Sequence, residues 1–156
     1  MIRIETDDPA RPDVHALLSE HLADMFATSP AESVHALDHS ALSHESITFW
    51  TARENGILLG CGALKVLGAP GEAELKSMRT AAEARGRGVA TLLLKHIVAE
   101  ARNRGFERLA LETGTEDYFA PARRLYAKHG FTECAPFADY TLDPNSVFME
   151  LPLQPK

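Results

Sequence analysis

RTAAEARGRGVATLLL, residues 79–94, joins a strand-like segment to an apolar helical segment through a loop that contains two glycines. The unpaired N–H groups at a helix start and the positive end of the helix dipole together attract anions. Gly86 and Gly88 would let the backbone approach a ligand closely, and Arg85 and Arg87 add positive charge. The stretch predicts a phosphate site. Taken alone, it also fits a tight turn with solvated arginines.

The pattern on either side of this loop predicts an α/β (α+β) domain. Before the loop, it predicts a strand at 1–6, a helix at 11–26, a hairpin of strands at 47–53 and 57–67 joined through Asn55-Gly56, and a strand at 72–80. After it come a helix at 89–106, a strand at 108–114, a helix at 118–130, and strands at 131–137 and 146–153. This order indicates a mixed sheet of six to seven strands flanked by helices.

The strand at 72–80 is unusually polar. Its alternation predicts Leu75, Ser77 and Arg79 on one face and residues 74, 76 and 78 on the other, so that both faces are partly polar.

Composition and length predict one domain over residues 1–156. A content of 45% hydrophobic and 24% charged residues is typical of a soluble globular protein.

No run approaches the roughly 20 apolar residues of a spanning helix, and the first residues lack the apolar core of a signal peptide, so we expect a cytoplasmic protein without a membrane partner. A net charge of −6 argues against a nucleic-acid partner. Cys61 and Cys134 are expected to be reduced.

Two other phosphate-binding loops fit the sequence less well. A P-loop needs Gly-Lys-Ser/Thr before its helix, and the sequence contains no such tripeptide. A dinucleotide-binding turn needs a third glycine where Thr91 stands, after a buried parallel strand that residues 74–80 are too polar to form. A nicotinamide-dependent oxidoreductase is therefore the weakest alternative.

Two segments resemble motifs of the GNAT superfamily of acetyltransferases. Residues 85–90, RGRGVA, match Arg/Gln-x-x-Gly-x-Gly/Ala, and residues 125–131, LYAKHGF, are similar to Leu-Tyr-x-x-x-Gly-Phe. Both occur in the order and spacing of the family, and the predicted elements follow its order over nearly the whole chain. The resemblance implies a mostly antiparallel sheet splayed between its fourth and fifth strands, acetyl-CoA as cosubstrate, and N-acetyltransferase activity.

The resemblance also implies where the cosubstrate lies. The pyrophosphate would sit on the N–H groups from Arg85 to Ala90 and the pantetheine along the strand that ends at Thr80, with an N–H near Met78 facing the developing oxyanion. Phe119 stands where the family often carries Asn, which removes a side-chain amide contact from that position. The expected cofactor-binding residues are Met78, Arg79, Thr80, Arg85, Gly86, Arg87, Gly88, Val89, Ala90, Thr91, Phe119 and Tyr126.

Acetyl transfer to an amine needs a base for the amine and an acid for the departing thiolate. The resemblance assigns the acid to Tyr126, which without it would be read as a core aromatic residue. Glu74 and Glu112 would flank the splayed strands as candidate bases. Glu74 is preferred because many relatives carry a carboxylate on that strand, while a solvated glutamate explains it equally well. Cys61 has no evident activating partner, which favours direct transfer in a ternary complex over an acetyl-cysteine intermediate.

The acceptor is expected to be a primary amine of a small molecule, a peptide or a protein, and the sequence does not identify it. His35, His39 and His44 complete no metal-binding signature, so no metal is expected and these residues are expected to border the acceptor pocket. The sequence leaves a homodimer open. A non-catalytic acyl-CoA-binding sensor that uses the same loop is the alternative from another functional class.

Overall fold

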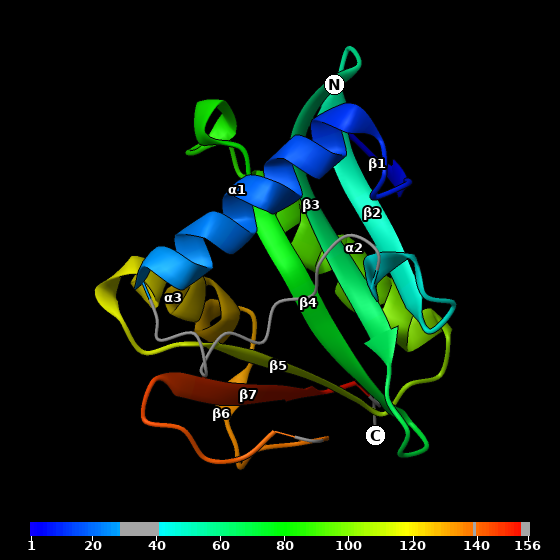
Figure 1. Ribbon diagram of the computed structural model, residues 1–156. Coiled ribbons are helices and arrows are strands. Elements are labelled where there is room, and N and C mark those ends of the chain that lie inside the picture. The colour runs from blue at the N-terminus through cyan, green and yellow to red at the C-terminus, as the bar shows by residue number, and fades with distance from the viewer. Residues whose placement is uncertain (29–40, 139, 154–156) are drawn as a thin grey trace.

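In the computed structural model, which describes residues 1–28, 41–138 and 140–153, seven strands form one sheet in the order β1-β2-β3-β4-β5-β7-β6 (Figure 1). The strands are β1 (Arg3–Thr6), β2 (Ile47–Glu54), β3 (Ile57–Val66), β4 (Glu72–Thr80), β5 (Arg108–Gly114), β6 (Thr132–Glu133) and β7 (Ser146–Pro152). The helices are α1 (Pro12–Thr28), α2 (Val89–Asn103) and α3 (Ala120–Lys128), with 3-10 turns η2 (Ala41–Ser43), η3 (Ala82–Ala84) and η4 (Asp117–Phe119). The predicted order is confirmed, although β6 is shorter than the strand expected at 131–137.

The first four strands form an antiparallel meander. The turn between β2 and β3 has φ of 53° at Asn55 and 81° at Gly56. Both residue types tolerate the left-handed conformation that a two-residue hairpin turn needs. The predicted hairpin is therefore confirmed, with its turn at the predicted residues.

The sheet opens between β4 and β5. These strands run parallel and pair only over Glu72–Glu74 and Arg108–Ala110. Beyond this short pairing β4 diverges from β5, while β5 pairs with β7 along its whole length (Figure 1). The predicted splay between the fourth and fifth strands is confirmed, and it creates the gap in which the candidate site lies.

Helices cover both faces of the sheet. Helix α1 crosses one face, and α2 and α3 lie against the other (Figure 1). The core beneath α1 contains Val14, Leu17, Leu18, Leu42, Phe49, Cys61 and Ala63, whereas the core beneath α2 and α3 includes Trp50, Leu64, Leu75, Leu93, Leu94, Ile97 and Tyr126. The two faces of the sheet are called below the α1 face and the α2 face.

A bulge in β4 changes which of its side chains share a face. Ser77 has φ of 57°, and the pairing of β3 with β4 shifts register between Cys61 and Ala63. Lys76 lies opposite Ala63 and Arg79 opposite Cys61, so both belong to the α1 face. The expectation of strict alternation, with residues 75 and 79 on one face, is wrong because the bulge inserts an extra residue.

Gly62 accommodates the bulge from the neighbouring strand. A Cβ at this position would lie 2.6 Å from Sδ of Met78 and 2.9 Å from Cδ1 of Ile97 on α2. The missing side chain therefore lets Met78 pack between β3 and α2, on the α2 face.

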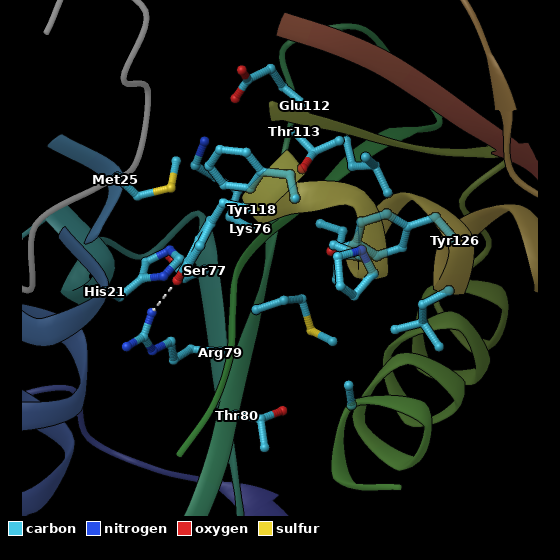
Figure 2. Close-up of a pocket in the computed structure, with 18 of the residues that line it drawn as sticks. His21, Met25, Lys76, Ser77, Arg79, Thr80, Glu112, Thr113, Tyr118 and Tyr126 are labelled. Atoms are coloured by element: carbon cyan, nitrogen blue, oxygen red, sulfur yellow. Dashed lines mark hydrogen bonds between the residues drawn. The ribbon is translucent and has the colours of Figure 1, made fainter. Parts of the chain in front are cut away.

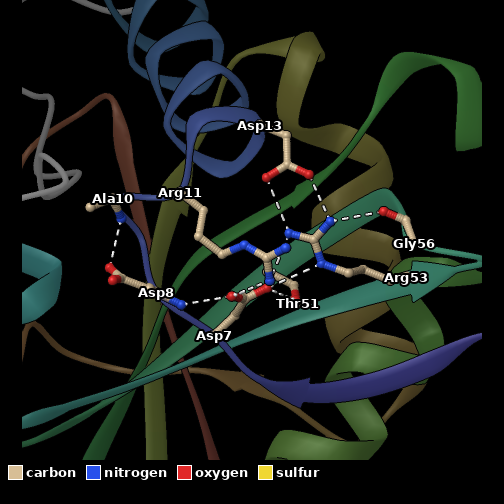
Figure 3. Close-up of polar contacts among 8 residues, drawn as sticks. All are labelled: Asp7, Asp8, Ala10, Arg11, Asp13, Thr51, Arg53 and Gly56. Carbon is tan, nitrogen blue, oxygen red and sulfur yellow. Dashed lines mark hydrogen bonds and ion pairs between the residues drawn. The ribbon is translucent and has the colours of Figure 1, made fainter.

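The start of α1 is held to the sheet by a polar network around Asp7 (Figure 3). Arg53 on β2 pairs with both Asp7 and Asp13, at 3.1 Å and 2.6 Å. Asp7 also accepts hydrogen bonds from Thr51 Oγ1 at 2.6 Å and from Arg11 at 3.0 Å. Burial by itself would raise the pKa of Asp7, but the hydrogen bonds it accepts lower this pKa to about 2.

We expect Asp7→Asn to lower the free energy of unfolding by about 2 kcal/mol at neutral pH, because one pKa unit corresponds to about 1.4 kcal/mol. The folded pKa lies below the unfolded value of 3.8, so this stabilisation is fully present above pH 3.8 and is lost as the pH falls through about 2. Urea unfolding of both proteins from neutral pH to pH 2 checks this. A stability difference that does not shrink in acid would contradict the role given to the Asp7 carboxylate.

Candidate active site

A pocket of about 590 Å³ fills the gap between β4 and β5 (Figure 2). Its walls come from β4, β5, α1, η4, α3 and the start of α2. Of the residues expected to form the site, those that line it are Glu74, Met78, Arg79, Thr80, Arg85, Ala90, Glu112, Phe119 and Tyr126. The remaining ones, Gly86, Arg87, Gly88, Val89 and Thr91, lie in the adjoining loop and the first turn of α2.

The loop before α2 has the form of an anion cradle. Gly86 and Gly88 have φ of 83° and 79°, and a Cβ at either position would meet no atom of the described residues within 4 Å. Gly88 is the N-cap of α2, and no side chain among the described residues caps the helix. The backbone N–H groups of the first turn can therefore bind an anion such as a pyrophosphate. Arg87 pairs with Glu54, whereas Arg85 lines the pocket.

Tyr126 is presented from α3 against the α2 face of the gap. The residue is 7% exposed, and its ring packs on Phe131 with the ring centroids 5.7 Å apart. Burial raises the pKa of its phenol, so the hydroxyl keeps its proton. Within the described residues this hydroxyl makes no hydrogen bond, and it is available to a group in the pocket.

Phe119 fills the corner between β5 and α3. A Cβ on Gly114 would lie 2.3 Å from the Phe119 ring, so the ring packs directly on the end of β5. The Arg123 guanidinium donates to the carbonyl oxygens of Gly114 and Glu116 and thereby ties this turn to α3. Phe119 therefore adds an apolar wall to the pocket.

The two candidate bases have different environments. Glu74 is 2% exposed, and its Oε2 accepts hydrogen bonds from Lys76 Nζ at 3.0 Å and from the Tyr140 hydroxyl at 2.6 Å. The alternative that Glu74 is a solvated strand residue is therefore wrong. Glu112 is partly exposed, and its Oε2 accepts a hydrogen bond from Ser146 Oγ at 2.8 Å. Glu74 is thus buried and paired with Lys76, whereas Glu112 is the more exposed of the two candidate bases.

Arg79 connects β4 to α1 instead of pointing toward the loop. Its Nη2 lies 2.7 Å from carboxylate oxygens of both Glu20 and Asp24, and its Nη1 donates to the Tyr118 hydroxyl at 3.0 Å. The Tyr118 hydroxyl in turn donates to Asp24 at 3.1 Å. This cluster joins α1 to η4 on one side of the pocket.

Sequence reasoning missed several residues of the pocket, and the polar ones among them include His21, Lys76, Ser77 and Tyr118. Burial and then the charge of Arg79 lower the pKa of His21 to about 4, so the imidazole is neutral at neutral pH. A signal for His21 was present, because it follows Leu17 by four residues and Leu18 by three and so lies on the inward stripe of α1. Figure 2 shows His21 beside Ser77 and Arg79, across the pocket from Tyr126.

Other groups near the site do not suggest additional chemistry. Burial raises the pKa of the Cys61 thiol to about 12, and its Sγ lies 3.3 Å from the Ser77 carbonyl oxygen. His44 was expected to border the acceptor pocket but does not line it; its imidazole hydrogen-bonds with Ser46, while His35 and His39 lie outside the described residues. Within residues 1–28, 41–138 and 140–153, no group of three potential metal ligands occurs, and no helix is long and apolar enough to cross a membrane.

Comparison with known proteins gives consistent matches. Residues 14–131 match the acetyltransferase (GNAT) family. The chain is 50% identical to YedL, an uncharacterised N-acetyltransferase of Escherichia coli, over 98% of this chain and 96% of that protein. It is 39% identical to the IAA acetyltransferase of Azospirillum brasilense, over 97% and 98% of the two chains. A crystal structure from Klebsiella pneumoniae, provisionally named an acyl-CoA N-acyltransferase, has a TM-score of 0.80 at 29% identity over 99% of both chains.

Proposed function

Since the chain belongs to the GNAT family of acetyltransferases, we propose that it transfers the acetyl group of acetyl-CoA directly to a primary amine held in the pocket between β4 and β5. One observation carries this proposal. Tyr126 lines the pocket from the α2 face, and its hydroxyl is protonated and makes no hydrogen bond within the described residues. The partly exposed carboxylate of Glu112 lines the same pocket. An acid and a base thus line a single pocket beside an anion cradle.

The residues around the gap fit an acyl-CoA. Acetyl-CoA supplies the acetyl group as a thioester with a good leaving group. The N–H groups at the start of α2, between Gly88 and Thr91, would hold its pyrophosphate, and Arg85 adds charge at the same end of the pocket. After Glu74, β4 no longer pairs with β5. The extended pantetheine arm can hydrogen-bond to the backbone N–H and C=O groups on that edge of β4 in the way an additional strand would.

The bulge in β4 supports the placement of an oxyanion contact. Ser77 adopts a left-handed conformation, which interrupts the regular pairing of β4 with β3 at this point. We assign the stabilisation of the developing negative charge to the backbone N–H near Met78, because a fixed N–H donor placed where charge develops is effective in a pocket shielded from water.

Proton movements are assigned to two side chains. Glu112 accepts the amine proton, directly or through a water molecule, because Glu74 is engaged with Lys76 and Tyr140. Tyr126 donates a proton to the departing thiolate. The raised pKa of Cys61 opposes an acetyl-cysteine intermediate, which supports direct transfer.

The test of this function is acetyl transfer itself. The protein is incubated with acetyl-CoA and a panel of amino acids, polyamines, peptides and arylalkylamines, and free thiol and acetylated product are both measured. We expect thiol and acetylated amine to appear in equal amounts. IAA belongs in the panel, because the Azospirillum relative is named for it. If CoA raises the melting temperature but no acceptor is acetylated, the result favours the acyl-CoA sensor instead.

A further inference from the structure

Two hydrogen-bonding groups in the pocket have no partner in the part of the chain that the structure describes. Arg79 is 7% exposed, and within the described residues its Nε has no hydrogen-bond partner, nor does the shielded Oγ of Ser77. Both residues line the pocket. Buried polar groups in native proteins are nearly always satisfied, so these two groups call for a partner from outside the described chain.

These groups lie on the acceptor side of the site. Arg79 is opposite Cys61 and therefore belongs to the α1 face, whereas Met78 and Tyr126 belong to the α2 face. Figure 2 shows Ser77 beside Arg79 and His21, and away from Tyr126. The proposed acid, Tyr126, must lie beside the departing thiolate, which places the cosubstrate toward the α2 face. The acceptor then approaches from the α1 face, where Arg79 and Ser77 can contact it.

The other contacts of Arg79 leave one of its donors unused. Its Nη2 lies 2.7 Å from carboxylate oxygens of both Glu20 and Asp24. Their contacts, together with that of Tyr118, occupy Nη1 and Nη2 and fix the guanidinium in place. The Arg79 Nε–H has no acceptor among the described residues.

We propose that the acceptor is an amino acid or a similar small amine with a carboxylate, and that Arg79 and Ser77 bind this carboxylate. The inference rests on the proposed function and specifies its substrate. A carboxylate only accepts hydrogen bonds, and it can accept one from the Arg79 Nε–H and one from the Ser77 hydroxyl. Glu112 then faces the amine of the same molecule, while Met25 and Tyr118 offer apolar contacts to its side chain.

The inference is tested with matched acceptors. L-methionine and L-phenylalanine are each compared with their amide and their decarboxylated amine. We expect kcat/KM to favour the carboxylate form by about 100-fold or more, because a site built to bind a polar group rejects analogues that lack it. Ser77→Ala and Arg79→Lys should each reduce this ratio by about tenfold or more, since each removes one hydrogen bond to a charged group. Ser19→Ala, on the exposed surface of α1, should leave the ratio unchanged.

Binding provides a readout that does not need turnover. With the protein saturated with CoA, either amino acid should raise the melting temperature, and its amide should not. Ser77→Ala should remove this effect and keep the stabilisation by CoA alone. Equal responses to acid and amide, or best turnover with an amine that lacks a carboxylate, would overturn the inference. Acetylation of those other amines would still support the proposed function, so the two proposals fail separately.

Discussion

Tyr126→Phe is expected to lower kcat for acetyl transfer by about 100-fold, the range typical of losing a general acid. The change removes only the hydroxyl, which makes no hydrogen bond within the described residues, and it keeps the ring that packs on Phe131. Stability should therefore stay nearly unchanged, as should the KM for acetyl-CoA. Steady-state kinetics with a saturating acceptor, together with thermal unfolding, measure all three quantities.

Tyr118→Phe is the matched comparison for this variant. It also removes one phenol oxygen from the pocket, but that oxygen bridges Arg79 and Asp24 on the acceptor side. We expect it to raise the KM of the acceptor more than it lowers kcat. Full activity of Tyr126→Phe would remove Tyr126 from the role of acid.

Gly88→Glu is expected to remove most of the stabilisation of the protein by CoA. The position has φ of 79°, which a side chain adopts with strain, and the introduced carboxylate would compete with the pyrophosphate for the N–H groups of α2. At a CoA concentration of 100 times Kd, the unchanged protein gains about 2.7 kcal/mol, whereas a Kd raised about 100-fold leaves roughly 0.4 kcal/mol. Thermal unfolding over a range of CoA concentrations measures this difference.

Gly105→Glu provides the control at the other end of the same helix. Gly105 has φ of 84°, and, as at Gly88, a Cβ there would meet no described atom within 4 Å. The backbone strain is therefore matched, but this position follows the C-terminal end of α2. We expect this variant to lose stability and to retain its response to CoA. Equal loss of the response in both variants would argue against an anion site at the start of α2.

Local patterns in the sequence determined the order of the elements and the glycine-rich loop that we propose for the cofactor. The Asn55-Gly56 turn, the glycines before α2 and the stop at Gly105 each depend on the conformational preference of one or two residues. The apolar stripe of α2 depends on spacing alone. Such features involve neighbours in the chain, so they can be predicted without knowing which distant segments meet.

The acceptor side was decided by the tertiary structure. Because Ser77 is not a glycine, its residue type does not predict the left-handed conformation that it adopts in β4. The bulge at this residue places Lys76 and Arg79 on the same face of the sheet. The hydrogen bonding of Glu74 depends on Tyr140, which lies 66 residues away along the chain and donates a hydrogen bond to it. The orientation of Arg79 depends likewise on Glu20, 59 residues earlier.

The physical reason for this division is the range of the interactions concerned. A turn or a helix start is set by local backbone energetics, which the sequence displays directly. The protonation and orientation of a buried charge depend on the groups that folding packs around it. The sequence by itself therefore determined the family and the fold and predicted the loop that we propose for the cofactor, whereas the tertiary structure decided which charges line the proposed acceptor side.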